Sequence, residues 1–318
     1  MARVSIAIRA FRRRWLAEAI ASVLAQTHRD LELVIYDDAG DLEPLARAAG
    51  DPRVRYHRAS ARRTASGRFA AAVALCRGVY VGVLDDDDAY APDFVAELAA
   101  ALDAHPAVGV AFCRTTWVDD RGPSSPLDPR AAGVIADAAA AMLRDGWTVT
   151  PSHLLFRRSA YDAVFADVPI PPDVAPDVQL NVRLALHGWR HLLVDRPLAL
   201  TRWHEDQLSR LSRAAIDRAI ATWRTLALAD PVLARHRDRR LARALLVRAT
   251  VGLASGDAGQ ARADLAAAAE ASPADWRTRR VALQAAAAAG TPGTFVAAAC
   301  QWWALRRRRR GPPRRIGD

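Results

Sequence analysis

The chain has 318 residues, of which 51% are hydrophobic and 25% are charged, proportions that are typical of a folded globular protein. Its formal net charge is +10, and it contains no lysine, so every basic side chain other than histidine is arginine. Schiff-base chemistry and phosphate binding by a P-loop lysine are therefore excluded. Arg306 to Arg310 and Arg314–Arg315 lie at the C-terminal end, which leaves the rest of the chain only mildly basic.

The cysteines and the hydropathy pattern predict the cellular compartment of the protein. Cys76, Cys113 and Cys300 lie far apart and lack the spacing of metal ligands, so we expect reduced thiols in a cytoplasmic protein. A strand pattern begins at Val4, which leaves no room for a signal peptide. No apolar run reaches the roughly 20 residues that span a bilayer.

The first part of the chain alternates strand and helix patterns. Short apolar runs predict strands at 4–8, 31–36, 54–57, 79–84 and 108–113. Helical spacing of apolar residues, or alanine-rich composition, predicts helices at 15–26, 42–49, 66–76 and 92–105. Strands separated by helices of this length predict a mostly parallel, doubly wound sheet.

The pattern is less regular further along the chain. Residues 122–128 are rich in proline and serine and predict a loop. Helices are predicted at 135–144 and 180–187, the latter ended by Gly188, and strands at 153–156 and 191–194.

From about Ser212 the composition changes to alanine, leucine and arginine, and strand patterns disappear. Helices are predicted at 241–254, 259–271 and 274–289, and the first two resemble a tetratricopeptide helix pair. One such pair cannot bury its own apolar face, so we expect it to pack on the first domain. A partner-binding surface is the alternative. The predicted domains are 1–210, 211–305 and a basic tail, 306–318.

Carboxylates follow two of the predicted strands. Asp37 and Asp38 end one, and a run of four, Asp85 to Asp88, ends another. In a parallel sheet both clusters lie at the same edge and border one crevice, where such sheets bind ligands. Adjacent carboxylates repel one another, and a hard divalent cation shared with substrate phosphates would offset that cost. The alternative is a solvated acidic loop.

Together these segments resemble family 2 glycosyltransferases of the GT-A fold over residues 3–208. The resemblance is carried by Val4 to Ile8, Ala19 to Thr27, Leu31 to Asp38, and Arg77 to Asp88 with Pro92 behind them. It implies a mixed, doubly wound α/β sheet with a Rossmann-like nucleotide-binding half. It also implies transfer of a sugar from a nucleoside-diphosphate donor, with Mg²⁺ or Mn²⁺ as cofactor.

The resemblance assigns donor contacts residue by residue. Ala10 and Phe11 would line the base pocket, Asp38 would hydrogen-bond the base, and Asp85 would face the ribose or diphosphate. Arg9, Arg12 and Arg68 are candidates for phosphate contacts.

Metal and catalytic roles are implied in the same way. Asp87 would hold the metal ion, His204 would lie near the diphosphate and the metal, and Asp88 would support the site, with Asp86 as a spacer. Asp177 takes the place of the general base, which would give a single displacement with inversion. The structural alternatives are helix capping for Asp177, a turn for Asp38 and an ordinary loop or core histidine for His204.

The chain departs from the family pattern at several donor-side positions. Arg9 replaces a proline, Arg12 replaces an asparagine, Ala39-Gly40 lacks a serine, and Phe69-Ala70 stands where Arg-Asn is usual. An inactive transferase-like domain with a helical protein-binding region is therefore one alternative. A nucleotidyltransferase is another, although residues 9–14 contain neither the glycine nor the lysine of its usual loop.

We therefore expect an inverting glycosyltransferase that acts on a hydroxyl of a glycan, a glycolipid or a related acceptor. The segment containing Trp302, Trp303 and Arg306 to Arg310 predicts contact with an anionic membrane surface. A solvated tail is its alternative. No nucleic-acid module accompanies the basic tail, so no nucleic-acid partner is expected.

Overall fold

The computed structural model describes residues 3–11, 14–38, 40–120, 122–125, 130–147, 149–204, 212–273 and 314–315. The chain divides into two compact units. The sheet unit comprises residues 1–142, 147–204 and 314–318, and the helical unit comprises residues 143–146 and 205–313. The predicted helix at 274–289, Trp302, Trp303 and Arg306 to Arg310 lie outside the described residues.

The sheet unit is built around one sheet, which has 11 strands among the described residues. These strands are β1 (Val4–Ala10), β2 (Leu31–Asp37), β3 (Val54–Arg58), β4 (Tyr80–Asp85), β5 (Ala89–Tyr90), β6 (Val108–Asp119), β7 (Gly122–Ser125), β8 (Gly133–Ile135), β9 (Leu154–Arg157), β10 (Arg190–Arg202) and β11 (Arg314–Arg315).

Strand order confirms the predicted mixed, doubly wound architecture. The main path runs β11-β7-β6-β9-β4-β1-β2-β3, and β10 pairs with β5, β6 and β8. Strand β1 is parallel to both β2 and β4. Strand β9 is antiparallel to both β4 and β6, so β6 runs in the same direction as β4. Strand β10 is parallel to β6, and all of these parallel strands therefore end at one edge.

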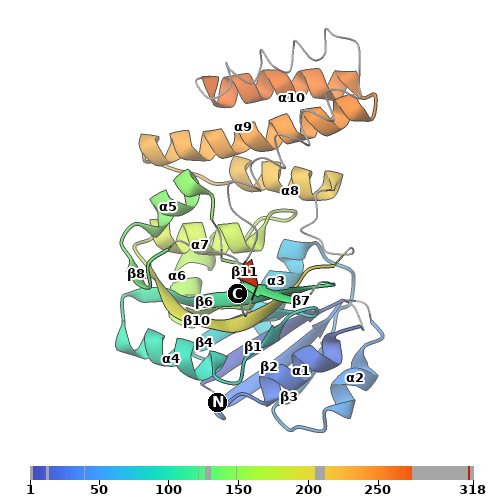
Figure 1. Ribbon diagram of the computed structural model, residues 1–318, viewed down its shortest axis with the longest axis vertical. Coiled ribbons are helices and arrows are strands. Elements are labelled where there is room, and N and C mark those ends of the chain that lie inside the picture. The colour runs from blue at the N-terminus through green and yellow to red at the C-terminus, as the bar shows by residue number, and fades with distance from the viewer. Residues whose placement is uncertain are drawn as a thin grey trace. The chain divides into compact units, whose positions relative to one another are not determined.

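Helices cover both faces of the sheet (Figure 1). Helices α1 and α2 lie on one face together with α4, and α3 lies on the other. The helices with residues in this unit are α1 (Leu16–Leu24), α2 (Glu43–Ala48), α3 (Ala65–Leu75), α4 (Phe94–Ala104), α5 (Ala138–Asp145), α6 (Arg158–Phe165) and α7 (Pro176–Leu186), with a 3₁₀ turn, η1 (Pro151–His153).

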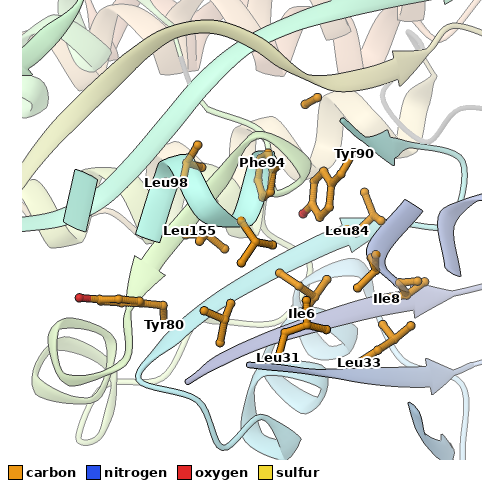
Figure 2. Close-up of a cluster of buried hydrophobic side chains, with 14 of the residues drawn as sticks. Ile6, Ile8, Leu31, Leu33, Tyr80, Leu84, Tyr90, Phe94, Leu98 and Leu155 are labelled. Atoms are coloured by element: carbon orange, nitrogen blue, oxygen red, sulfur yellow. The ribbon is translucent and has the colours of Figure 1, made fainter. Parts of the chain in front are cut away.

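Alternation along the strands supplies the core beneath α1 and α4. Ile6, Ile8 and Leu33 point to the same face, as expected for every second residue of a strand, and pack near Phe94 and Leu98 (Figure 2). Each of these side chains is fully buried. Burial of such a side chain stabilises the fold by about 1.5–3 kcal/mol, so this layer holds β1, β2 and β4 in register.

A buried glutamine connects the end of α1 to the start of α4. The Gln26 side-chain amide donates to the carbonyl of Ala91 (2.8 Å), and its oxygen accepts from the Val95 N–H (2.9 Å). Buried polar groups are retained when their hydrogen bonds are made. Gln26 therefore fixes the chain a few residues after the acidic run.

Several predicted boundaries were wrong. The predicted loop at 122–128 begins with strand β7, whose residues Gly122 to Ser124 pair with β6. The predicted helix at 135–144 is preceded by strand β8 and begins at Ala138. Helix α7 begins at Pro176, four residues earlier than predicted, because proline fits the first helical position. Helices α6 and α8 and strands β5 and β8 were not predicted.

The helical unit contains α8 (Arg213–Arg224), α9 (Pro231–Ala254) and α10 (Ala258–Ala271) among its described residues. Side chains of Ser212, Asp230 and Asp257 cap the three N-termini, as expected of these residue types. Arg248 of α9 donates two hydrogen bonds to Asp264 of α10 (2.9 and 2.6 Å) and one to Asp217 of α8 (2.7 Å). One guanidinium thus connects three helices.

None of the helices in the described part of the chain combines the length and the apolar character needed to cross a bilayer.

Candidate active site

The two carboxylate clusters meet at one edge of the sheet, as predicted. Strand β1 lies between β2 and β4, with Ala10 in register with Asp37 and Arg9 in register with Asp85. The run Asp85 to Asp88, called the acidic turn below, therefore lies one strand away from Asp38.

Three carboxylates of the acidic turn converge. Oxygen atoms of Asp85, Asp87 and Asp88 all lie within 4.8 Å of one another, and Asp87 and Asp88 are buried. Carboxylate oxygens are the ligands that Mg²⁺ and similar hard cations prefer. The predicted metal position at Asp87 therefore lies in a cluster that also includes Asp85 and Asp88.

The surroundings of Asp88 favour the binding of a positive charge. Burial raises the pKa of Asp88 well above its usual value, and the charges of Asp85 and Asp87 raise it further. The Arg202 N–H donates to the Asp88 carboxylate (3.1 Å), and a hydrogen bond from Ser152 acts in the opposite direction on its pKa. A cation among these carboxylates would favour the ionised form, so the residues present fit a divalent metal ion.

Asp87 is held by the end of β10. Its carboxylate lies 2.9 Å from Nε2 of His204, and its carbonyl accepts from the Arg202 guanidinium (2.9 Å). The His204 ring packs against Trp15, with 4.6 Å between ring centroids. The segment 202–204 thus brings His204 to Asp87, where the resemblance implied a group near the metal and diphosphate.

Asp85 and Asp86 connect the acidic turn to its neighbours. Asp85 forms an ion pair with Arg9, and its N–H donates to the Ser152 hydroxyl (3.1 Å). Asp86 is buried and accepts a hydrogen bond from the Phe11 N–H. Asp86, expected as a spacer, thus anchors the chain that follows β1.

A pocket of about 460 Å³ opens beside Asp38. Its lining includes Phe11, Asp38, Gly40, Arg58, Ala59, Ala61 and Arg62. The guanidinium carbons of Arg62 and Arg68 lie 4.8 and 5.3 Å from the centroid of the Phe11 ring, a cation–π geometry. We call this the donor pocket, after the role that the sequence resemblance implies for Phe11 and Asp38. The Ala10 side chain is buried, and its carbonyl accepts from the Asp38 N–H (3.0 Å).

Arg68 belongs to the donor pocket. It forms an ion pair with the buried Asp38 carboxylate (3.1 Å), which also accepts from the Arg63 N–H (3.1 Å). This ion pair therefore fixes the orientations of the Arg68 and Asp38 side chains. The Arg68 guanidinium, a candidate for phosphate contacts, therefore lies against Asp38. Arg12, another phosphate candidate, lies outside the described residues.

Asp177 lies in the first turn of α7, and its side chain is half-buried. The N-cap of this helix is Ala175, so Asp177 is not the capping residue that the structural alternative required. Its carbonyl accepts from the Asn181 side chain (2.7 Å). An acidic group in the first turn is favoured by the helix dipole.

Sequence reasoning missed several residues that shape the site. Ser152 is fully buried and precedes β9, far from the acidic turn in sequence. Arg62 and Arg63 stand in an arginine-rich segment without an obvious motif. Trp15 was assigned to a helix and instead packs on His204. The basic segment 61–63 was the one sequence signal that could have indicated these residues, because it precedes the alanine-rich helix that carries Arg68.

Comparison with known proteins identifies the class. The model of glycosyl transferase family 2 matches residues 5–165, which include β1 to β4 and the acidic turn. The chain belongs to this family.

Individual relatives agree with this assignment. An uncharacterised glycosyltransferase from Nostoc sp. (strain PCC 7120) is 30% identical over 168 residues, which are 50% of this chain and 51% of the relative. The chain thus spans about half the length of that relative, and a smaller share of the other curated relatives.

Solved structures share the fold. The crystal structure of S. aureus TarS 1–349 in complex with UDP-GlcNAc superposes with a TM-score of 0.61 at 15% identity, covering 84% of this chain and 81% of TarS 1–349. The mannosyltransferase PcManGT from Pyrobaculum calidifontis, in complex with GDP-Man and Mn²⁺, gives a TM-score of 0.56 at 19% identity, covering 94% of this chain and 86% of PcManGT. The GT-A-like fold expected from the sequence is thereby confirmed.

Proposed function

We propose that this protein transfers a sugar, with inversion, from a nucleoside-diphosphate donor to a hydroxyl of a glycan, a glycolipid or a related acceptor. The observation that carries the proposal is the juxtaposition of the donor pocket and the acidic turn at one edge of a family 2 sheet. The donor pocket offers an aromatic ring and a carboxylate to a nucleotide base. The acidic turn offers three carboxylates at the position expected for a diphosphate.

Asp85, Asp87 and Asp88 would hold a Mg²⁺ or Mn²⁺ ion. When bound, such an ion supplies Lewis-acid stabilisation of the negative charge that grows on the leaving diphosphate. His204 is kept against Asp87 by its hydrogen bond and by the Trp15 ring. In this position His204 orients the carboxylate and would lie near the diphosphate.

The donor pocket would hold the nucleotide base. Phe11 presents its ring for stacking, and Arg62 and Arg68 limit the motion of that ring. Asp38 would accept a hydrogen bond from the base, because a carboxylate is an acceptor. Its ion pair with Arg68 keeps it oriented for that role.

Asp177 would serve as the general base. The acceptor hydroxyl becomes a competent nucleophile when a carboxylate removes its proton. Attack from the face opposite the diphosphate then forms the new glycosidic bond as the phosphate–anomeric carbon bond breaks, which inverts the anomeric configuration. The proton ends on Asp177.

The test is nucleotide binding by the full chain in the presence and absence of Mn²⁺. UDP, GDP and dTDP are titrated by calorimetry, and nucleotide sugars are screened for hydrolysis. We expect at least one nucleotide to bind in a Mn²⁺-dependent manner. Asp87→Ala should weaken that binding at least about 100-fold, because a direct ligand should matter no less than an outer-shell partner.

The matched control is Asp103→Asn, which changes a carboxylate at the opposite end of β4, where it bonds Tyr80. It should bind nucleotide like the parent. Failure of every nucleotide to bind, with Asp87→Ala indistinguishable from the parent, would instead favour an inactive transferase-like domain.

A further inference from the structure

Two stacked tryptophans lie at the sheet edge that carries the acidic turn. Trp117 is near the end of β6, and Trp203 follows β10 directly, with its N–H donating to the carbonyl of Val118 (2.8 Å). Their ring centroids are 5.8 Å apart and their planes differ by 7°. The two rings therefore form a single flat stack.

The stack lies on the sheet face that carries η1. Trp117 is in register with Thr201, and alternate residues of a strand share a face, so Thr115 and Trp117 lie on one face with Thr201 and Trp203. The Thr201 hydroxyl bonds both Thr115 (3.1 Å) and His153 of η1 (2.7 Å).

The η1 turn is also in contact with the acidic turn. Ser152, the neighbour of His153, accepts from the Asp85 N–H. Trp203 itself stands between Arg202 and His204, which bond Asp88 and Asp87. The segment of chain that carries Trp203 therefore borders the acidic turn.

Sheet order separates the stack from the donor pocket. Strands β6 and β9 lie on one side of β4, and β1 and β2 lie on the other. Phe11 and Asp38 follow β1 and β2, whereas Trp117 lies near the end of β6. The stack is thus placed on the far side of the carboxylates from the donor pocket, the side expected for a second substrate.

One of the two indoles remains open to solvent. Trp117 is 36% exposed, and among the described residues with large exposed hydrophobic side chains it is the one aromatic. Trp203 supports it from one side and fixes its orientation. A rigid, oriented aromatic side chain binds with little loss of conformational entropy.

A flat apolar surface beside polar and charged groups has a particular chemical complement. Pyranose rings carry a face of C–H bonds and a rim of hydroxyl groups. The C–H face packs on an aromatic ring, and the rim bonds polar neighbours. We infer that Trp117 and Trp203 form a stacking platform for a sugar ring of the acceptor, so the acceptor is a saccharide. This inference rests on the proposed function, which makes the acceptor the second substrate.

The test is direct binding of saccharides by the full chain. The labelled protein is applied to a printed array of defined bacterial oligosaccharides, and its binding of Mn²⁺ and UDP, GDP or dTDP is measured in parallel. We expect the parent chain to bind at least one saccharide. Trp117→Ala should weaken that binding about three- to tenfold, the effect of losing one aromatic stacking contact, with nucleotide binding unchanged.

Two variants make the comparison specific. Trp117→Tyr keeps a flat ring and should retain most of the binding. Val168→Ala truncates another exposed apolar side chain of the same unit, which is 62% exposed, and should bind like the parent. Thermal unfolding of each variant checks that the fold is intact.

Two results would overturn the inference. One is saccharide binding by a folded Trp117→Ala that equals that of the parent. The other is a parent chain that binds Mn²⁺ and nucleotide but none of the saccharides, which would leave the proposed donor chemistry in place. Absence of nucleotide binding by the parent chain would count against the proposed function. The saccharide array would still show whether Trp117 and Trp203 bind a sugar ring.

Discussion

The donor pocket and the acidic turn lie one strand apart, yet they balance their charges in different ways. In the donor pocket the Asp38 carboxylate is paired with Arg68 and bonded by the Arg63 N–H. In the acidic turn three carboxylates share a small volume, and burial and mutual repulsion raise the pKa of Asp88. The Asp38 carboxylate is thus paired within the protein, whereas the three carboxylates of the turn could hold an added cation.

This difference suggests a division of labour. A pocket whose carboxylate is already paired can hold its geometry before any ligand arrives, which is the basis of preorganised binding. A turn with excess negative charge gains free energy when a metal and a diphosphate bind together. We therefore expect recognition of the base to be independent of metal, and binding of the diphosphate to depend on it.

The largest expected effect concerns the transfer step alone, apart from binding in the donor pocket and in the acidic turn. Asp177→Asn should lower transfer by about 10²–10⁴-fold, the usual contribution of a general base, while Mn²⁺ and nucleotide binding stay unchanged. Steady-state transfer assays and calorimetry measure the two properties. The matched control is Asp173→Asn, because Asp173 is exposed and has a φ of 57° that asparagine also tolerates. Equal transfer by parent and Asp177→Asn would exclude the base role.

A second variant weakens the acidic turn without removing a carboxylate. Ser152→Ala deletes the buried hydroxyl that accepts from the Asp85 N–H and bonds Asp88. Loss of such supporting groups typically costs about 10–100-fold in metal affinity, so Mn²⁺ binding should weaken by that factor. Mn²⁺ titration followed by electron paramagnetic resonance measures it. Ser22→Ala, which removes a hydroxyl bonded within α1, should change nothing.

A third variant tests the donor pocket alone. Asp38→Asn removes the charge that pairs with Arg68, and nucleotide binding should weaken about tenfold, as for the loss of one charge-assisted hydrogen bond. Mn²⁺ binding in the absence of nucleotide should be unaffected. Asp51→Asn, remote from the pocket and paired with Arg53, serves as control. A parallel loss of Mn²⁺ affinity would mean that the donor pocket and the acidic turn do not act independently.

The last expected effect concerns acid stability and needs neither metal nor nucleotide. Burial lowers the pKa of His153 from 6.5 to about 4 and that of His191 from 6.5 to about 3. The unfolded chain therefore binds more protons than the folded chain at acidic pH. The stabilisation is fully present above pH 6.5 and is lost as pH falls toward 4. Thermal unfolding should show a decrease in Tm of about 10 °C from pH 7 to pH 5.

Substitution identifies the histidines responsible. His191→Asn should reduce the slope of Tm against pH, because one buried titrating group is removed. His105→Gln changes an exposed histidine and should leave the slope as in the parent. An unchanged slope in His191→Asn would show that other groups control acid stability.

Much of this architecture follows from local sequence pattern. The apolar runs of β1, β2 and β4 and the carboxylates that follow two of them are contiguous in sequence. The rule that parallel strands end at one edge then places Asp38 beside Asp85 to Asp88. The helices α1 and α4 follow from the spacing of their apolar residues.

Other features depend on contacts between distant segments. Ser152 reaches Asp85 across 67 residues, and no local pattern distinguishes it from another serine. Strand β7 contains Pro123 and two serines, which predict a loop, yet pairing with β6 determines its conformation. The partner of Arg68 also depends on tertiary structure, because α3 and β2 lie far apart in the sequence.

The guanidinium of Arg248 has a consequence for how the helical unit unfolds. Stacked helices usually interact with their neighbours alone and can be lost one at a time. Here, detachment of α8 or α10 would leave Arg248 without one of its carboxylates, and detachment of α10 would expose Asp264, which is 2% exposed in the folded chain. The Asp264 side chain is 2% exposed, whereas the Asp217 side chain is 44% exposed, so the pair with Asp264 is the stronger of the two. Helices α9 and α10 should therefore melt together, and α8 should be coupled to them more weakly.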